Sequence, residues 1–282
     1  MINQIVNNLS MLTKQQRIDL ANQHHQEMLD KYPEQINECI KNTVIHTEDN
    51  TPKYSGDDLN TTFSLIPLDS VSALFDSNKI NMTDKIAVMN FASFTNPGGL
   101  YLSGSNAQEE CLCFESILYE VLVKQDDFYM TNQSLKNRGL YTNRALYTPN
   151  VLFERNGLNT CADVLTIASP NHNILKYYPN LFTDKENTDT LLERIKFARD
   201  ILSIYNVKYF IAGAFGCGVF KQDPFEVAKL FIKVFIRSSC DRVIFAIPPS
   251  GPNYQAFYKV LVNFMNIQVS VLSYIDELTV KR

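Results

Sequence analysis

The sequence predicts an α/β fold, in which helices cover a mostly parallel or mixed β-sheet. Short apolar runs recur along the chain and are typical of strands that are buried on both faces of a sheet. Longer segments with helical spacing of their apolar residues lie between these runs. Two glycine-containing loops each follow a predicted strand and precede a predicted helix. The 282 residues are enough for one large α/β domain, or for one domain with a helical extension.

The N-terminal part of the chain is predicted to be helical. Apolar residues recur at loose helical spacing through residues 1–45, and Pro33 divides this segment into two expected helices. Residues 47–60 are polar and contain a proline and a glycine, which predicts a loop. We therefore expect residues 1–58 to form a helical extension that packs on a main domain of residues 59–282.

Strands and helices are expected to alternate through the main domain. Strands are expected at residues 61–67, 85–92, 145–153, 162–169, 207–212, 242–247 and 267–273. Helices are expected at residues 68–79, 187–205, 224–236 and 255–265, besides one that begins near residue 106. Pro149 lies within its strand, so that strand is expected at a sheet edge or to be bent. Asp223 is expected to cap the helix that starts at Pro224, whereas the polar residues 125–140 are expected to be rich in loops.

Charge and cysteine content limit the functional classes. A formal net charge of −4 argues against general nucleic-acid binding, because that needs a basic surface, but it allows a small patch for an anionic ligand. There is no signal-peptide pattern and no run of about 18 apolar residues, so we expect a cytoplasmic protein that does not enter a membrane. The six cysteines form no CxxC pair and the four histidines show no ligand spacing. We therefore expect buried, reduced thiols and no metal site.

The first glycine loop leads into a helix that begins with two adjacent acids, Glu109 and Glu110. Asn106 can cap this helix, and Glu109 stands at the third position after it, where its side chain can complete a capping box. Gly98 and Gly99 allow backbone N–H groups to approach a ligand closely, because neither residue carries a Cβ atom. The alternative for these glycines is a plain turn between strand and helix.

Glu110 is predicted to head a mainly apolar helix face, with Cys113, Phe114 and Ile117 three, four and seven residues further on. A buried carboxylate without a partner is costly, so such a group takes up a proton or finds a partner. A carboxyl group at a loop mouth above an apolar wall is a candidate for acid/base or oxocarbenium chemistry. The alternative is an ordinary first-turn acid that faces solvent.

The second glycine loop, GAFGCGVF, spans residues 213–220 between a predicted strand and a capped helix. Its GxxGxG spacing is a variant of the turn in which backbone N–H groups bind phosphate oxygens. It has neither the GxGxxG order of dinucleotide-binding turns nor the GK[ST] of a P-loop. A diphosphate site and a tight connection between strand and helix both remain open. Phe215 and Phe220 flank the loop and could pack on a sugar or base, or could belong to the core.

Together these residues resemble the microbial (bacterial-type) poly(ADP-ribose) glycohydrolases. The similarity lies in the run NFASFTNPGG, in AQEECL shortly after it, and in GAFGCGVFKQDPFEVAKLF downstream. The signature of that family is three glycines, a short spacer and then Gln-Glu-Glu, to which Gln108 and the two acids after it correspond. The resemblance implies a three-layer α/β/α macrodomain-like mixed sheet with an N-terminal helical extension. It covers most of the chain and requires no metal or cofactor.

The resemblance also implies roles for individual residues. Glu110 would be catalytic, because it would protonate the leaving group and then activate water at the anomeric carbon of the distal ribose. Glu109 would bind ribose hydroxyl groups, and Gln108 would belong to the substrate site. Gly98 and Gly99 would face the distal ribose and the diphosphate.

In the second loop the resemblance implies a diphosphate site and a ribose contact. Phe220 would pack near the distal ribose and position it. The diphosphate would lie against the backbone N–H groups of Gly216, Cys217, Gly218 and Val219.

The sequence departs from the family pattern at two positions. Leu100 replaces the third glycine, where we expect backbone strain if the position requires a positive φ, and added bulk beside the ligand. Ser93 replaces the asparagine of the family's FAN motif, which helps to hold the ribose. Either change could weaken activity or shift it toward another ADP-ribosyl linkage.

The expected function is a glycohydrolase that cleaves the ribose–ribose bond of poly(ADP-ribose) and releases ADP-ribose. Its expected partners are ADP-ribose, the polymer and ADP-ribosylated proteins, and we expect a monomer. Two alternatives remain: a hydrolase that removes mono-ADP-ribose from protein side chains, and a non-catalytic module that binds ADP-ribose.

Overall fold

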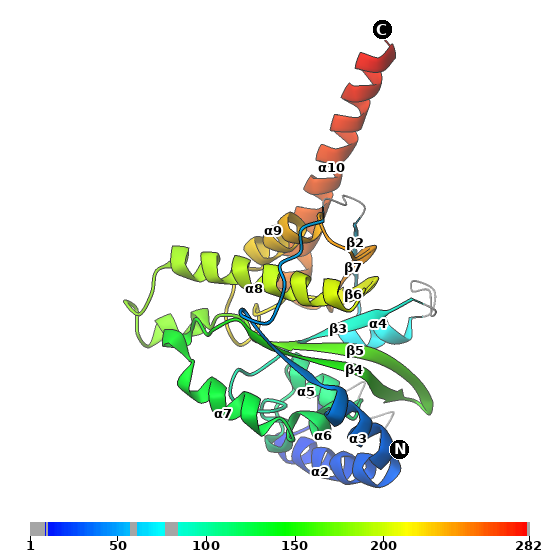
Figure 1. The fold of residues 1–282 in the computed structure, drawn as a ribbon, viewed down its shortest axis with the longest axis vertical. Helices are drawn as coiled ribbons and strands as arrows, with labels where there is room; N and C mark the ends of the chain where they lie inside the picture. Colours follow the sequence, from blue (N-terminus) through cyan, green and yellow to red (C-terminus); the bar gives the residue numbers. More distant parts are fainter. Residues whose placement is uncertain (1–8, 10, 57–60, 77–83, 281–282) are drawn as a thin grey trace.

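A seven-stranded mixed sheet forms the centre of the molecule in a computed structural model (Figure 1). The structure describes residue 9 and residues 11–56, 61–76 and 84–280, with residues 267–280 described as backbone. The strands are β1 (Val44–Thr47), β2 (Thr62–Ile66), β3 (Ile86–Phe91), β4 (Arg144–Arg155), β5 (Leu158–Ile167), β6 (Tyr209–Ala212) and β7 (Arg242–Ala246). Their order across the sheet is β1-β4-β5-β3-β6-β7-β2.

The two kinds of strand pairing determine where loops gather. β4 runs antiparallel to both β1 and β5, whereas all other neighbours are parallel. The carboxyl ends of β2, β3, β5, β6 and β7 therefore lie along one edge of the sheet. In open α/β sheets, ligands bind outside this edge.

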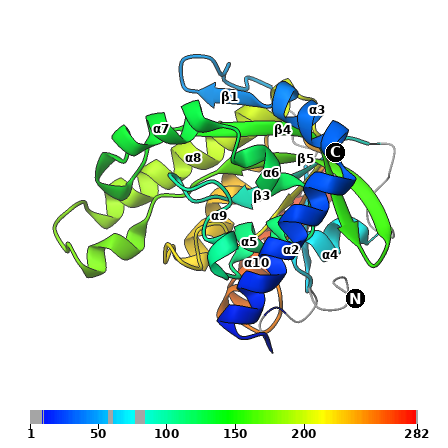
Figure 2. The same cartoon turned by 90° about the horizontal axis from the view of Figure 1, so that it is seen from below.

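Helices cover both faces of the sheet and form a three-layer α/β/α sandwich (Figure 1). One face carries α8 (Asp184–Ile204), α9 (Pro224–Phe235) and α10 (Pro252–Val280). The other face carries α3 (Pro33–Asn42), α4 (Ser70–Phe75), α5 (Gln108–Cys113), α6 (Leu118–Leu122) and α7 (Asp126–Ser134). A further helix, α2 (Lys14–Lys31), lies on the outer side of α5 and α6 (Figure 2). The predicted fold class is confirmed.

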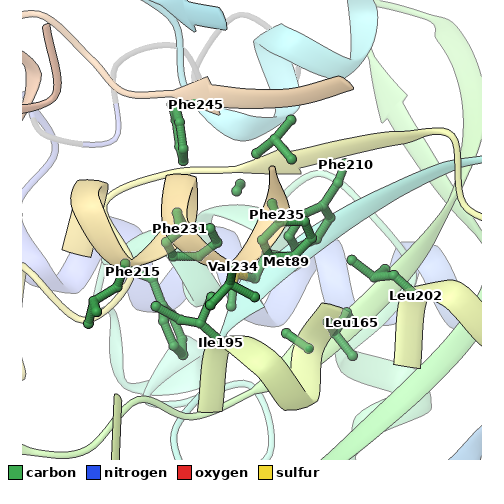
Figure 3. Packing of buried hydrophobic residues seen from close by; sticks show 14 of the residues in the cluster. Met89, Leu165, Ile195, Leu202, Phe210, Phe215, Phe231, Val234, Phe235 and Phe245 are labelled. Carbon is green, nitrogen blue, oxygen red and sulfur yellow. The ribbon is translucent and has the colours of Figure 1, made fainter. Parts of the chain in front are cut away.

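The larger core lies between the sheet and the layer of α8, α9 and α10 (Figure 3). Phe235 of α9 stacks on Phe231 and on Phe210 of β6, with ring centroids 5.7 and 5.5 Å apart. Complete burial of a large apolar side chain stabilises the fold by roughly 1.5–3 kcal/mol. Phe215 of the second glycine loop is also fully buried and contacts Phe231 edge-to-face. The core therefore holds this loop in place.

Local sequence signals explain where three helices begin. α2 and α8 each start with a capping box, formed by Thr13 with Gln16 and by Thr183 with Glu186. The predicted cap of α9 is confirmed, because the side chain of Asp223 accepts hydrogen bonds from two backbone N–H groups of its first turn.

Several predictions of secondary structure were wrong. Residues 267–273 are not a strand, because α10 runs from Pro252 to Val280 without an intervening glycine or proline. Residues 125–140 contain the helix α7, which buries Phe128, Tyr129 and Asn132. The prediction missed β1, which pairs with β4 over four residues. β1 belongs to the expected helical extension, so that segment also adds a strand to the sheet; the domain boundary itself stays a prediction.

The remaining predicted elements are present in the described part of the chain, with shifted ends, and the helix expected from about residue 106 is divided into α5 and α6. Residues 1–8 and 10 of the expected N-terminal helices lie outside the described residues. β4 is bent by an irregularity between Thr148 and Val151, next to Pro149, but it is not an edge strand. The helix predicted at residues 68–79 is confirmed as far as Phe75, and residues 77–79 lie outside the described part of the chain. All six cysteines are free thiols, but only Cys39, Cys113 and Cys240 are buried; Cys111 and Cys217 are partly buried, and Cys161 is exposed. In the part of the chain described, no helix has the length and apolar character needed to cross a membrane.

Candidate active site

A pocket of about 270 Å³ lies at the carboxyl ends of β3, β5 and β6, where the two glycine loops meet. Both loops and the start of α5 contribute to its walls. The lining residues are Phe91, Ala92, Ser93, Asn96, Gly99, Leu100, Ser105, Ala107, Gln108, Glu109, Glu110, Ser169, Phe215, Gly216, Gly218, Val219 and Phe220.

Most of the predicted site residues therefore lie together. Of the residues expected to bind substrate, Gly98 and Cys217 do not line the pocket in the described structure. Gly98 contacts the core instead, because a Cβ atom there would stand 2.6 Å from the ring of Tyr119. Cys217 is partly buried, and desolvation raises the pKa of its thiol to about 12. The thiol is therefore no nucleophile at neutral pH.

Glu109 is buried, and both of its carboxyl oxygens accept hydrogen bonds. Oε1 accepts from Nδ2 of Asn90 at 3.1 Å, and Oε2 accepts from the backbone N–H of Ser93 at 2.7 Å. Desolvation raises the pKa of this carboxyl group to about 8, against the lowering effect of these bonds. Glu109 is therefore protonated at neutral pH for most of the time.

The carboxyl group of Glu110 is also buried but has a different environment. Its Oε1 accepts a hydrogen bond from the backbone N–H of Leu100 at 2.9 Å. Its Oε2 is buried and has no hydrogen-bond partner among the described residues. Cys113, Phe114 and Ile117 are all buried, as predicted. The expectation of one continuous apolar helix face was wrong, because α5 ends at Cys113 and Ile117 lies at the start of α6. One oxygen is thus held in place while the other can still accept or donate a proton.

Gly99 lies directly against both acids. A Cβ atom at this position would overlap Oε1 of Glu110 and would stand 3.0 Å from Oε2 of Glu109. The residue also has a φ of +62°, which favours glycine. This position therefore requires glycine for two independent reasons.

The predicted capping box at the start of α5 is wrong. The N-cap residue is Ala107, not Asn106, and it makes no side-chain hydrogen bond. The carboxyl group of Glu109 is directed to Asn90 and Ser93 instead, because tertiary partners at the end of β3 replace the local one. Gln108 also contacts β3: its side chain accepts from the N–H of Phe91 at 2.8 Å and donates to the carbonyl of Met89 at 2.8 Å.

The backbone of Leu100 is not strained, although this residue stands where the family signature has its third glycine. Its φ is −116°, an ordinary value for leucine, so the expectation of backbone strain was wrong. The positive φ values fall on Gly98 and Gly99, and Leu100 begins the next turn. Leu100 is 56% exposed and lines the pocket. The expectation that its side chain adds bulk beside the ligand remains a prediction.

The second glycine loop lines the pocket and carries backbone N–H groups without a protein acceptor among the described residues. Within the described structure, those of Gly218, Val219 and Phe220 donate to no protein acceptor. A Cβ atom at Gly218 would have no heavy atom within 4 Å, so crowding by the protein is not the reason for a glycine at this position. Phe215 belongs to the core, and Phe220 lines the pocket. A row of open N–H groups is a binding site for an anion such as a diphosphate.

The sequence interpretation missed several residues of the site, and Asn90 is the most informative of them. Asn90 is fully buried near the end of β3, where its amide donates to Glu109 and to Thr166. Its Oδ1 has no partner among the described residues. A polar residue inside the apolar run KIAVMNFA was the available signal. Phe91 and Ser169 gave no comparable signal.

Metal ligands are not gathered at this site. In residues 9, 11–56, 61–76 and 84–280, no group of three or more His, Cys, Asp or Glu side chains could hold a metal ion. The arrangement supports acid/base chemistry by carboxyl groups beside a loop whose backbone N–H groups have no acceptor among the described residues.

The fold is that of a macrodomain-type glycohydrolase. The structure of poly(ADP-ribose) glycohydrolase (PARG) from Thermomonospora curvata matches with a TM-score of 0.77 and 23% identity, over 87% of this chain and 99% of that chain. The same protein bound to the inhibitor ADP-HPD matches with a TM-score of 0.76. PARG from Deinococcus radiodurans in complex with ADP-ribose matches with a TM-score of 0.68 and 26% identity, over 80% of this chain and 96% of that chain.

Residues 6–156 match the family model described as microbial-type PARG, catalytic domain. This range is more than half of the chain, so the chain belongs to that family of glycohydrolases. The resemblance drawn from the sequence is confirmed. No protein among the curated sequences matches the chain.

Proposed function

We propose that this protein cleaves the ribose–ribose glycosidic bond of poly(ADP-ribose) and releases ADP-ribose. Family membership, the fold shared with bacterial PARG structures and the pocket at the strand ends support this function. The observation that carries it is Glu110: a buried carboxyl group with one oxygen fixed by Leu100 N–H and the other unpartnered among the described residues. A module that only binds ADP-ribose has no need for such a group.

In this proposal, Glu110 transfers the protons. Its protonated Oε2 donates to the glycosidic oxygen as the bond to the anomeric carbon breaks, and the leaving ribose departs as a hydroxyl. The positive charge that develops on the distal ribose is that of an oxocarbenium ion. The carboxylate of Glu110 then accepts a proton from water as the water oxygen bonds to the anomeric carbon. The carboxyl group ends the cycle protonated again.

The other site residues bind and orient the substrate in this proposal. Glu109 is held by Asn90 and Ser93 and, being largely protonated, can both donate to and accept from ribose hydroxyl groups. The N–H groups of Gly218, Val219 and Phe220 would bind the diphosphate. Such preorganised donors need little rearrangement when the substrate arrives.

The test is Glu110→Gln, assayed by ADP-ribose release from poly(ADP-ribose). Loss of a general acid is expected to lower the rate by about 10²–10⁴-fold, while calorimetry should still detect ADP-ribose binding. Glu115→Gln is the matched control, because Glu115 is also buried, follows α5 and does not line the pocket. Unchanged polymer hydrolysis by Glu110→Gln would sink the catalytic assignment.

Removal of mono-ADP-ribose from protein side chains is the second candidate function. The exposed side chain of Leu100 favours it, because this bulk stands at the pocket where the family signature has glycine. Parallel incubation with the polymer and with mono-ADP-ribosylated protein separates the two functions. Faster release from the mono-modified protein would favour the second candidate.

A further inference from the structure

We propose that α2 holds the first glycine loop in the conformation that fixes Glu110, and that Tyr101 and Arg17 are the positioning residues. This inference rests on the proposed role of Glu110. No residue of α2 lines the pocket among those described, so the effect is indirect. The effect of α2 on Glu110 is transmitted by residues 98–105.

The segment 98–105 is a compact turn whose backbone is bonded to itself. Tyr101 N–H donates to the carbonyl of Gly98 at 3.2 Å, and Ser105 N–H donates to the carbonyl of Leu100 at 3.2 Å. Leu100 N–H points out of this turn and donates to Glu110. A shift of the turn would therefore move the donor that orients the carboxyl group.

Tyr101 fixes one side of the turn to α2. Its side chain is 1% exposed, and its hydroxyl donates to the carbonyl of Ala21 at 3.2 Å. Nδ1 of His24 lies 2.8 Å from the same oxygen. Nδ1 of His24 donates to this oxygen in one tautomer and accepts from it in the other, so the two side chains are hydrogen-bonded in either tautomer. Burial lowers the pKa of His24 to about 4, so this imidazole is neutral near pH 7.

Arg17 fixes the other side of the turn. Its Nε donates to the carbonyl of Gly104 at 2.7 Å, and one terminal nitrogen donates to the carbonyl of Leu12 at 2.5 Å. Gly104 has a φ of +75°, and a Cβ atom there would stand 2.7 Å from the carbonyl oxygen of Lys14. The backbone of the turn thus lies directly against α2.

Both attachments lie within four residues after Leu100, whose N–H donates to Glu110. Tyr101 follows Leu100 directly, and Gly104 closes the same turn. An isolated loop of this length would sample several conformations, whereas contacts at Tyr101 and Gly104 restrict the turn to one. α2 therefore acts as a support that lies outside the pocket and defines its geometry.

The main test is Tyr101→Phe, which removes one hydroxyl and keeps the ring that packs 4.7 Å from Phe114. We expect kcat on poly(ADP-ribose) to fall about tenfold, because small displacements of catalytic groups are costly, with the Kd for ADP-ribose changed less than about twofold. Tyr32→Phe is the matched control: Tyr32 is also buried and bonds Glu154 and Asn159, away from the turn. It should lose similar stability without the loss in kcat.

A second pair of variants keeps the test decisive if Tyr101→Phe folds poorly. Arg17→Ala should lower kcat in the same way, and Arg17→Lys should restore part of it, because the ammonium group can reach one carbonyl. Equal kcat values for wild type, Tyr101→Phe and Arg17→Ala would overturn the inference. Parallel losses of kcat and of ADP-ribose affinity would also overturn it, because they would indicate a general structural disturbance of the pocket. If Glu110→Gln is fully active, the proposed function fails first, whatever these variants show.

Discussion

Glu109 and Glu110 are adjacent in the sequence, but their carboxyl groups have different surroundings. Glu109 has a hydrogen bond to each oxygen, whereas Glu110 keeps one oxygen without a partner among the described residues. Helical periodicity predicted the burial of Cys113 and Phe114 beside Glu110, but it did not predict that α5 ends there. It could not predict the partners of Glu109, because Asn90 and Ser93 are brought close by the fold rather than by the helix.

The pKa of Glu109 leads to a prediction about stability. The carboxyl group has a pKa of about 8 in the folded protein and an ordinary value of 4.5 in the unfolded chain. Between these values the folded state keeps a proton that the unfolded state has released, so stability falls as pH rises through 8. Between about pH 7 and about pH 9 this contribution amounts to roughly 1 kcal/mol, or about 2–4 °C in Tm.

Thermal unfolding of wild type and Glu109→Gln at these two pH values measures the effect. Groups remote from Glu109 contribute equally in both proteins, so the difference between the two proteins reports on Glu109 and its neighbours. The Tm of the wild type should fall by more than the Tm of the variant between the lower and the higher pH. Parallel pH curves would contradict a pKa of about 8 for Glu109 in the folded protein.

At the scale of elements, strands and helices with strong local signals were predictable from the sequence. β3 is a short apolar run, and α9 starts with Asp223 and a proline. The errors fall where a pattern is ambiguous or weak. Residues 267–273 alternate apolar and polar residues like a strand, but they continue a helix that no glycine or proline ends. β1 is only four residues long, and pairing with β4 stabilises it more than its own sequence does.

The two glycine loops illustrate the same limit. Their positions after β3 and β6 were predictable, because a strand precedes each loop. That they meet at one pocket follows from the sheet order, in which β3 and β6 are parallel neighbours. The spacing of the two loops along the sequence does not reveal the order of the strands in the sheet.

The second loop provides a prediction at the element scale. A Cβ atom at Gly218 would have no neighbouring heavy atom within 4 Å, and the residue has no positive φ, so Gly218→Ala should fold with an unchanged Tm. The new methyl group would point into open space beside the N–H groups proposed to bind the diphosphate. We expect the Kd for ADP-ribose to rise about tenfold, the equivalent of about 1.4 kcal/mol.

Calorimetry with ADP-ribose measures this effect, and Gly251→Ala is the matched control. Gly251 has equally open space and likewise no positive φ, but it lies before α10 and outside the pocket. Equal affinities for the two variants would place the diphosphate elsewhere.

At the scale of the whole molecule, the two glycine loops are held in place by different parts of the fold. The core of α8, α9 and α10 anchors the second loop through Phe215. The opposite layer and α2 anchor the first loop through Tyr101. The site is formed where these two independently supported loops meet, which explains why neither loop alone defines it.

The charge distribution of the whole molecule leads to a last prediction. The protein has a net charge of −4, and no Lys, Arg or His lines the pocket among the described residues. An anionic diphosphate would therefore be bound by backbone dipoles against a weak overall repulsion. Salt screens repulsion between distant charges but weakens short contacts with buried dipoles far less.

We expect the Kd for ADP-ribose to change less than about twofold between about 50 mM and about 500 mM NaCl, and to fall rather than rise. Isothermal titration at both salt concentrations measures this, with adenosine as an uncharged reference ligand. Attraction by cationic side chains predicts the opposite, because screening would then weaken binding. A tenfold loss of ADP-ribose affinity at high salt, absent for adenosine, would show that lysine or arginine side chains bind the diphosphate instead of the loop backbone.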